Sequence, residues 1–275
     1  MKSAYSAYMA GLMDTDGTFG IYGLRASDGH LNYICRVSLT NVNKSLMDWI
    51  VDTFGGTYSI QLDYGKHRLA YSWRTQNAGH TKKFIESILP YLMIKRDEAK
   101  IVLEYIALEG ARCPDTRKQL SERLKSLKIN REFVTTDMPG IFDGWEKNDI
   151  QAYCAGVLDG DGHISVKDKE YGKTVISITN KFKPMLTGIS LLYGGYIQEH
   201  KADKRAWLEW RLHNNEKKEM FLLATLPYLI VKREKALRAL NTIRKSRFKK
   251  MKIQSDLMGD HESALTGTLE AINTM

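Results

Sequence analysis

The sequence contains few of the residues that cross-link small proteins, build zinc sites or anchor proteins in membranes. Three cysteines among 275 residues are an odd number without paired ligand spacing, so we expect reduced thiols and an intracellular protein. The seven histidines are scattered, which also disfavours a zinc site. No apolar run approaches the ~20 residues of a membrane span, and no signal peptide pattern begins the chain. We therefore expect neither membrane insertion nor secretion.

The composition is that of an ordinary globular protein with an excess of positive charge. Hydrophobic residues make up 43% and the formal net charge is +9. This excess favours an anionic partner, although many basic proteins bind no nucleic acid. The length is sufficient for one large domain or for two domains of about 100 to 150 residues, each with its own core.

A nonapeptide occurs twice in changed form, as MAGLMDTDG at residues 9–17 and as CAGVLDGDG at residues 154–162. Each copy is a short helical pattern that ends in two aspartates and a glycine. The C-terminus of a helix is the negative end of its dipole, so each aspartate is unfavourable there by some tenths of a kcal/mol. An unfavourable placement that occurs twice indicates a cation-binding role.

The similarity continues beyond the nonapeptide, with matching Thr-Asn pairs, Gly-Gly turns, Trp-Arg pairs and Leu-Pro-Tyr-Leu-x-x-Lys segments in the same order. Because the same motifs occur in the same order in both halves of the chain, they indicate a duplicated domain. We predict repeats at residues 1–112 and 148–252, a linker at 113–147 with a basic helical stretch, and a tail at 253–275. The spacing between landmarks is smaller in the second repeat, so we expect shorter connections after its first and second strands.

Each repeat predicts the same α+β unit with the element order αββαββα. In the first repeat the patterns place strands at residues 18–25, 31–40, 57–63 and 67–75, and a helix at 43–54. Pro90 ends or kinks the next helix. The whole chain is then two pseudo-symmetric repeats, each a four-stranded antiparallel sheet with helices on one face, joined at the two acidic helices.

The face of each sheet without helices is predicted to be polar and basic, which suits contacts with DNA phosphates and base edges. A solvated sheet face is the alternative. Trp207 departs from the polar pattern and could stack, insert as a wedge or lie at a sheet edge. The residues predicted to contact DNA are Tyr22, Asn32, Arg36, Ser38, Arg68, Ser72, Arg74, His163, Ser165, Lys167, Lys173, Ser177, Gln198, His200, Glu209 and Arg211.

The two acidic helices carry small residues four positions apart, Ala7 with Gly11 and Ala152 with Gly156. Small residues at this spacing allow two helix backbones to pack closely side by side. Asp16 would then lie close to its counterpart in the second repeat, in a groove between the sheets. Two carboxylates that close raise the pKa of one of them unless a cation lies between them. Carboxylate ligands suit magnesium better than zinc.

The two acidic motifs, with the rest of the repeats in register, resemble the LAGLIDADG homing endonucleases in their single-chain form. The resemblance covers about residues 5–110 and 150–247. It implies a monomeric endonuclease that cuts both strands of a long, pseudo-palindromic DNA target and leaves short 3′ overhangs. It also implies a Mg²⁺ cofactor, with Mn²⁺ as a substitute and Ca²⁺ supporting binding without cleavage.

The resemblance assigns roles to residues of both repeats. The implied metal ligands are two carboxylates and two backbone carbonyls, those of Asp16, Asp161, Thr15 and Gly160. The residues implied to order water around the scissile phosphate are Lys95, Lys232, Asn41 and Asn180. Asp14 and Asp159 would have supporting roles near the helix ends. Each residue also has a structural alternative, since such a lysine could be a surface charge and such an asparagine a turn residue.

Two other functions remain open on the sequence alone. One is an RNA maturase that binds a group I intron and assists splicing without cutting DNA. The other is a DNA-binding regulator built on a decayed nuclease, although both aspartates of the motifs are present. A glycosidase with two aspartates is remote, since nothing indicates a sugar cleft. The compartment is expected to be bacterial or phage-infected cytoplasm, or an organelle for an organelle-encoded protein.

Overall fold

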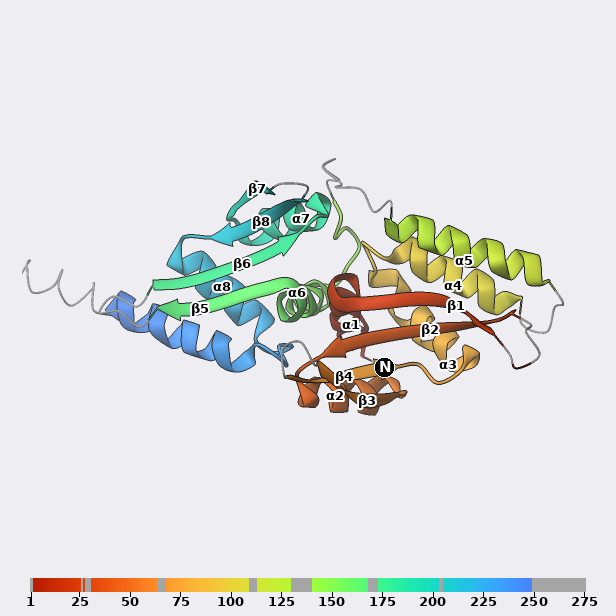
Figure 1. Cartoon of the computed structure of the whole chain (residues 1–275). Helices are drawn as coiled ribbons and strands as arrows, with labels where there is room; N and C mark the ends of the chain where they lie inside the picture. Colours follow the sequence, from red (N-terminus) through yellow and green to blue (C-terminus); the bar gives the residue numbers. More distant parts are fainter. Residues whose placement is uncertain are drawn as a thin grey trace, which may run out of the picture.

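The computed structural model describes residues 2–25, 27, 31–63, 68–108, 113–129, 140–167, 173–202 and 205–248. The predicted tail at 253–275 and part of the predicted linker lie outside these residues. The N-terminal repeat consists, in chain order, of α1 (Ser3–Asp16), β1 (Gly17–Arg25), β2 (Leu31–Asn41), α2 (Lys44–Phe54), β3 (Thr57–Asp63), β4 (Arg68–Arg74), α3 (Ala78–Ile88), a 3-10 turn (Leu89–Tyr91) and α4 (Arg96–Ala107) (Figure 1).

The C-terminal repeat has the same element order. It consists of α6 (Lys147–Asp161), β5 (Gly162–Lys167), β6 (Lys173–Asn180), α7 (Lys183–Tyr193), β7 (Tyr196–Ala202), β8 (Arg205–Leu212), α8 (Asn215–Thr225) and a helix at 233–248. The sheets are antiparallel, with strand orders β1-β2-β4-β3 and β5-β6-β8-β7. The predicted fold class of two αββαββα repeats is confirmed.

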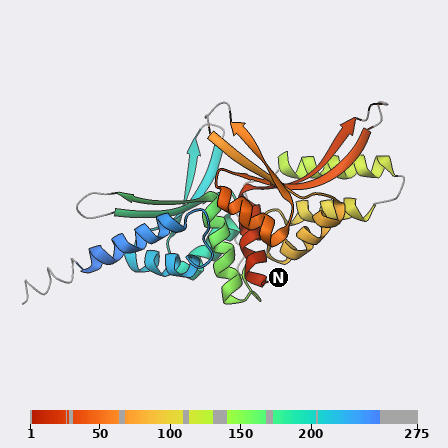
Figure 2. The ribbon, with the colours of Figure 1, turned by 90° about the horizontal axis from the view of Figure 1, so that it is seen from below.

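Helices cover one face of each sheet, and the strands of both repeats lie on the other side of these helices (Figure 2). The covered faces hold the core, in which Val37, Leu39 and Trp73 are fully buried in the first repeat, and Ile176 and Trp210 in the second. Residues at alternate positions of the same strands point to the opposite face. The sequence predicted this division correctly.

In each repeat a hydrogen bond joins the tryptophan of the Trp-Arg pair to the first glycine of the Gly-Gly turn. Gly55 follows α2 with a φ of 75°, and its carbonyl accepts a hydrogen bond of 2.8 Å from Nε1 of Trp73. In the second repeat Gly194 has a φ of 72° and accepts the equivalent bond from Trp210 at 2.9 Å. Glycine is favoured there because its backbone tolerates positive φ, and the tryptophan ties each helix end to its sheet.

The predicted linker is in part a packed helix. Residues of α5 (Pro114–Ile129) lie against α4 and β1, with Leu120 and Leu124 buried. The hydroxyl of Ser121 donates to the carbonyl of Ile21 at 3.0 Å, and Lys128 donates to the carbonyl of Phe19. This helix therefore belongs to the N-terminal repeat, because its apolar side is buried there.

The prediction of shorter connections after the first and second strands of the second repeat is wrong at both places, and the connection that shortens follows the third strand. After the second strand, two residues precede the helix in each repeat, 42–43 and 181–182. The first hairpin keeps a five-residue connection, 26–30 or 168–172, but its strands shorten from nine and eleven residues to six and eight. Removing equal lengths from two paired strands preserves their register. In the second hairpin the connection itself shortens, from 64–67 to 203–204.

No helix in the described part of the chain is long and apolar enough to cross a membrane.

Candidate active site and nucleic-acid interface

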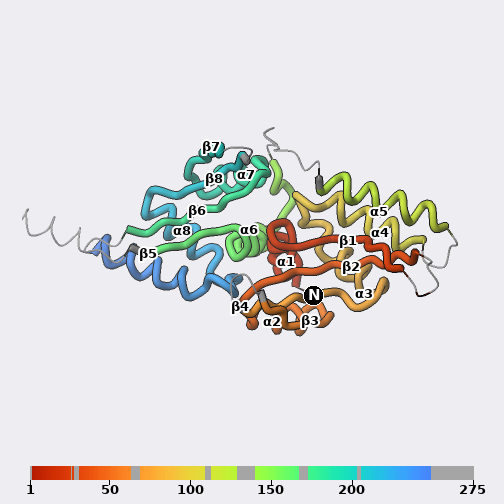
Figure 3. The backbone as a smooth tube through the Cα atoms, viewed as in Figure 1, coloured from red at the N-terminus to blue at the C-terminus, as the bar shows by residue number. Residues whose placement is uncertain are grey.

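The two acidic helices, α1 and α6, lie side by side in the middle of the molecule (Figure 3). A Cβ atom on Gly11 would lie 2.3 Å from the carbonyl oxygen of Tyr153, and one on Gly156 would lie 2.1 Å from that of Tyr8. Both distances are too short for any side chain. The predicted close approach through small residues is therefore confirmed, and it requires glycine at both positions.

The C-terminal ends of α1 and α6 converge, which brings Asp16 and Asp161 near one another. Partial desolvation raises the pKa of both carboxyl groups, and the charge of Asp16 raises the pKa of Asp161 further. The ammonium groups of Lys95 and Lys232 oppose these shifts. Within the described residues, no cluster of three or more His, Cys, Asp and Glu side chains could hold a metal. A cation bound here would rely on two carboxylates, which suits magnesium because it keeps several water ligands.

Lys95 caps the acidic end of α1. Its side chain is buried, with 4% exposed, and Nζ donates to the carbonyls of Met13 at 2.8 Å, Thr15 at 3.0 Å and Gly17 at 2.6 Å. The last carbonyls of a helix have no partner within the helix and carry its negative dipole end. The lysine therefore offsets the charge that the aspartates of the motif add there.

Lys232 occupies the matching position at the end of α6. Nζ donates to the carbonyl of Asp159 and, at 3.2 Å, to that of Gly160, while burial lowers the pKa of the lysine. The carbonyls of Thr15 and Gly160, which the resemblance assigned to metal, thus each accept a bond from a lysine. A carbonyl oxygen has two lone pairs, so their role as ligands stays a prediction.

The first aspartate of each motif holds the backbone of the segment that carries the lysine. Asp14 is buried and accepts hydrogen bonds from the amides of Met93, Ile94 and Lys95 at 2.8, 3.1 and 2.9 Å. Asp159 does the same for residues 230–232, at 2.8, 3.0 and 2.7 Å. These carboxylates lie at the N-termini of the following helices, where negative charge is favourable. Asp14 and Asp159 were predicted to have supporting roles, and in the structure they hold the backbone of the two lysine segments.

Two tyrosines exchange hydrogen bonds between the repeats. The hydroxyl of Tyr153 donates to Asp14 Oδ2 at 2.8 Å, and that of Tyr8 donates to Asp159 Oδ2, also at 2.8 Å. Burial raises the pKa of both phenols, so they remain donors. Each lysine segment therefore depends on a tyrosine of the opposite repeat. Sequence reasoning missed both residues, although a tyrosine before each motif was a usable signal.

The two asparagines at the strand ends differ in their contacts. Nδ2 of Asn180 donates to Asp161 Oδ2 at 2.7 Å, which lowers the pKa of that carboxyl. Oδ1 of Asn41 accepts from the amide of Asn43 at 3.0 Å in a local turn, as Asn180 does from Phe182. Among the described residues, no hydrogen bond joins Asn41 to Asp16. Only the second repeat thus connects its asparagine to its aspartate.

Three solved structures with the same arrangement of elements are of proteins bound to DNA. I-SmaMI, bound to an uncleaved DNA target with calcium ions, superposes with a TM-score of 0.64 at 18% identity, covering 89% of this chain and 92% of its own. I-GzeII, a LAGLIDADG homing endonuclease in complex with its DNA target, superposes with a TM-score of 0.65 at 15% identity, covering 90% and 91%. I-LtrWI, a LAGLIDADG homing endonuclease bound to target DNA, superposes with a TM-score of 0.65 at 16% identity, with the same coverage. This chain has the single-chain LAGLIDADG fold.

No family sequence model matches the chain, and no curated protein matches it in sequence. The likeness to LAGLIDADG proteins is thus carried by the structure and by the short motifs. Its coverage of about 90% on both sides means that both repeats of the LAGLIDADG fold are present. The resemblance inferred from the motifs is confirmed at the level of fold.

The open faces of the LAGLIDADG sheets carry the residues predicted to contact DNA. Tyr22, Arg74 and Gln198 are exposed. Ser177 is an exception, because it is buried at 3% exposure beneath the neighbouring polar side chains and does not reach solvent. The side chains of Arg68 and Lys167 lie outside the described residues. Trp207 stacks on His200, with ring centroids 5.5 Å apart.

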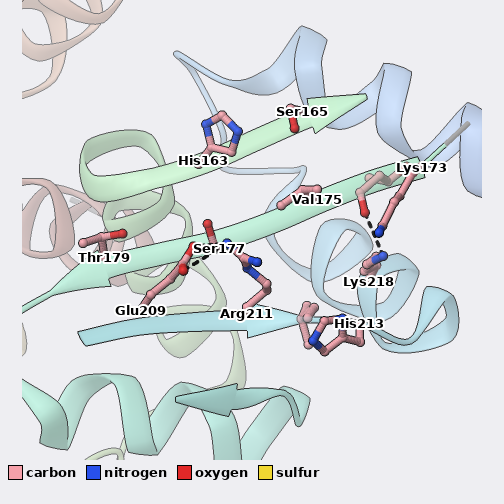
Figure 4. Close-up of a pocket in the computed structure, with 12 residues that line it drawn as sticks. His163, Ser165, Lys173, Val175, Ser177, Thr179, Glu209, Arg211, His213 and Lys218 are labelled. Carbon is pink, nitrogen blue, oxygen red and sulfur yellow. Dashed lines mark hydrogen bonds and ion pairs between the residues drawn. The ribbon is translucent and has the colours of Figure 1, made fainter. Parts of the chain in front are cut away.

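A hollow of about 540 Å³ opens on the C-terminal sheet (Figure 4). Basic side chains from three strands and from α8 surround it, and one acidic side chain lies among them. The charged residues and histidines at the hollow are His163, Lys173, Glu209, Arg211, His213 and Lys218. A basic hollow on an open sheet is suited to an anionic ligand.

Proposed function

We propose that this protein is a site-specific DNA endonuclease that makes a Mg²⁺-dependent double-strand break with short 3′ overhangs. The observation that carries this proposal is the position of Asp16 and Asp161, which lie together where the two repeats meet. The basic open sheets of the same two repeats supply a surface for the DNA on either side. A single chain then provides both half-sites and cuts an asymmetric, pseudo-palindromic target.

Each residue of the centre has a task in this proposal. Asp16 and Asp161 hold the cation, which when bound would activate water and neutralise charge on the scissile phosphate. Lys95 and Lys232 add positive charge beside the two aspartates, and Asn180 orients Asp161 and favours its ionised form. The raised pKa of both aspartates is consistent with a site that is complete only with a cation.

The similar proteins support the proposal through what they bind. I-SmaMI binds its DNA target in the presence of calcium ions, and I-GzeII and I-LtrWI bind DNA targets. In this chain the open face is basic on the C-terminal sheet and carries exposed Arg74 on the N-terminal sheet, which suits a DNA partner.

The test is cleavage of a randomised duplex library in Mg²⁺, with Ca²⁺ as the control for binding alone, followed by sequencing of the cut ends. We expect cut ends that share one long asymmetric motif with a short 3′ overhang, and none in Ca²⁺. Binding of a motif without cutting in Mg²⁺ would overturn the proposal. Intron RNA would then be the next ligand to test.

A further inference from the structure

One acidic side chain lies on the basic open face of the C-terminal sheet. Glu209 on β8 accepts two hydrogen bonds from Nη2 of Arg211, at 2.8 and 3.0 Å. Nε2 of His200 on β7 lies 3.3 Å from the same carboxylate. Residues two apart on a strand share a face, so the glutamate and the arginine are presented together beside the hollow (Figure 4).

Glu209 is held ionised and turned toward the protein. Burial alone would raise its pKa, but hydrogen bonds from Arg211 and Ser177, and the nearby charge of Arg211, bring it below its ordinary value. Only 14% of its side chain is exposed. A free glutamate on a DNA-binding face would accept a hydrogen bond from the amino group of cytosine. This carboxylate has already used its acceptor sites on its neighbours.

The matching arginine of the N-terminal sheet is not held in this way. The position that corresponds to Glu209 is Ser72, which accepts a hydrogen bond of 3.1 Å from the hydroxyl of Thr40. Among the described residues, no hydrogen bond or ion pair engages the exposed side chain of Arg74. A free arginine loses side-chain rotamer entropy when a ligand fixes it. Arg211 is already held by Glu209 before any DNA binds.

We propose that Glu209 is a positioning residue that holds Arg211 so that its remaining donors meet a guanine in the C-terminal half of the DNA target. The inference rests on the proposed function, because it needs DNA on this face. Arg211 keeps 38% of its side chain exposed, so donors remain for a ligand. Arginine pairs with O6 and N7 of guanine more often than with any other base edge.

The test measures DNA binding and does not depend on cleavage. Target duplexes are selected in Ca²⁺, and the dissociation constant is measured for all four bases at each position of the selected target. For the wild type we expect one position in the C-terminal half where guanine is preferred by about 5- to 150-fold. Glu209→Gln should reduce that preference several-fold at this position alone. Glu199→Gln, the same change at an exposed β7 glutamate that pairs with Lys201, should leave it unchanged.

Each other outcome has a distinct meaning. Unchanged guanine preference in Glu209→Gln overturns the inference, and so does loss of a cytosine preference, because Glu209 would then contact the base itself. If Glu209→Gln does not fold, Arg211→Lys replaces it; that variant should keep general DNA affinity but lose the guanine preference, and retained preference overturns the inference. A wild type that selects no motif overturns the proposed function instead.

Discussion

The two repeats are alike at the helix pair and different around it. Gly11 with Gly156, Tyr8 with Tyr153, and Asp14 with Asp159 occur as matched pairs with matched contacts. Lys95 and Lys232 occupy matched positions and both donate to the matched carbonyl, that of Thr15 or Gly160, while their other bonds differ. Other contacts differ among the described residues: α5 packs on the first repeat alone, and only the second repeat has the Asn180–Asp161 bond, at the end of α6, and the Glu209–Arg211 pair on its open face. The symmetric part is the one that would face two equivalent phosphodiester bonds. The asymmetric part is the one that would face two different half-sites.

The largest expected effect tests the symmetry of the centre. Asp16→Asn and Asp161→Asn should each reduce double-strand cleavage by about 10³-fold or more, since each removes one of two charges that hold the cation. DNA binding in Ca²⁺, followed by gel shift, should remain. Equal losses would support a shared centre, and retained cutting in both variants would refute it.

The next effect tests the contact between the repeats. Gly156→Ala should lower the free energy of unfolding by about 1 to 3 kcal/mol, because its Cβ would meet the carbonyl oxygen of Tyr8 and the backbones must separate. Gly79→Ala is the matched control, since a Cβ there meets only Asn77 Oδ1 at 3.5 Å. Chemical denaturation measures both. Equal stability of the two variants would contradict the close packing of α1 on α6.

The crossed tyrosines give the third comparison. Tyr8→Phe and Tyr153→Phe should each cost about 1 to 3 kcal/mol of stability, because each leaves a buried carboxylate without one donor. The Tyr153 donor favours the ionised form of Asp14, whose pKa burial raises, so loss of this donor raises the pKa of Asp14 in the folded protein further. The cost of Tyr153→Phe should therefore be full at neutral pH and should shrink as pH falls and Asp14 becomes protonated.

The control for the tyrosines is Tyr5→Phe. Tyr5 lies on the same helix as Tyr8, where its ring packs edge-on against Trp49 and it is partly exposed. This variant should show no pH-dependent loss. If Tyr8→Phe and Tyr153→Phe cost no more stability than Tyr5→Phe in urea melts at neutral pH, the crossed bonds contribute nothing to stability.

The symmetric features were largely predictable from the sequence because they depend on local patterns that repeat. Strand alternation placed Val37 and Trp73 inside, and glycine at matched helix positions indicated close packing. The hydrogen bond from Tyr8 to Asp159 joins residues 151 positions apart, and no spacing rule identifies such a pair. Likewise, α5 is basic and polar in sequence, so its packing against β1 depends on a surface that only the folded repeat presents.

The smallest effect concerns the two asparagines, whose residue type is the same and whose contacts differ. Asn180 donates to Asp161 and so favours its ionised form, whereas Asn41 makes only a local turn contact. Removing the donor in Asn180→Ala should raise the pKa of Asp161, and the acid limb of kcat/KM against pH should move to higher pH. Asn41→Ala should leave that limb in place. Because the two aspartates share one centre, a shift in Asp161 alone should slow one strand more than the other, and nicked duplex should accumulate below neutral pH. If both variants shift the acid limb of the kcat/KM profile equally, a water molecule connects Asn41 to Asp16 in solution. The two repeats would then be equivalent at the catalytic centre.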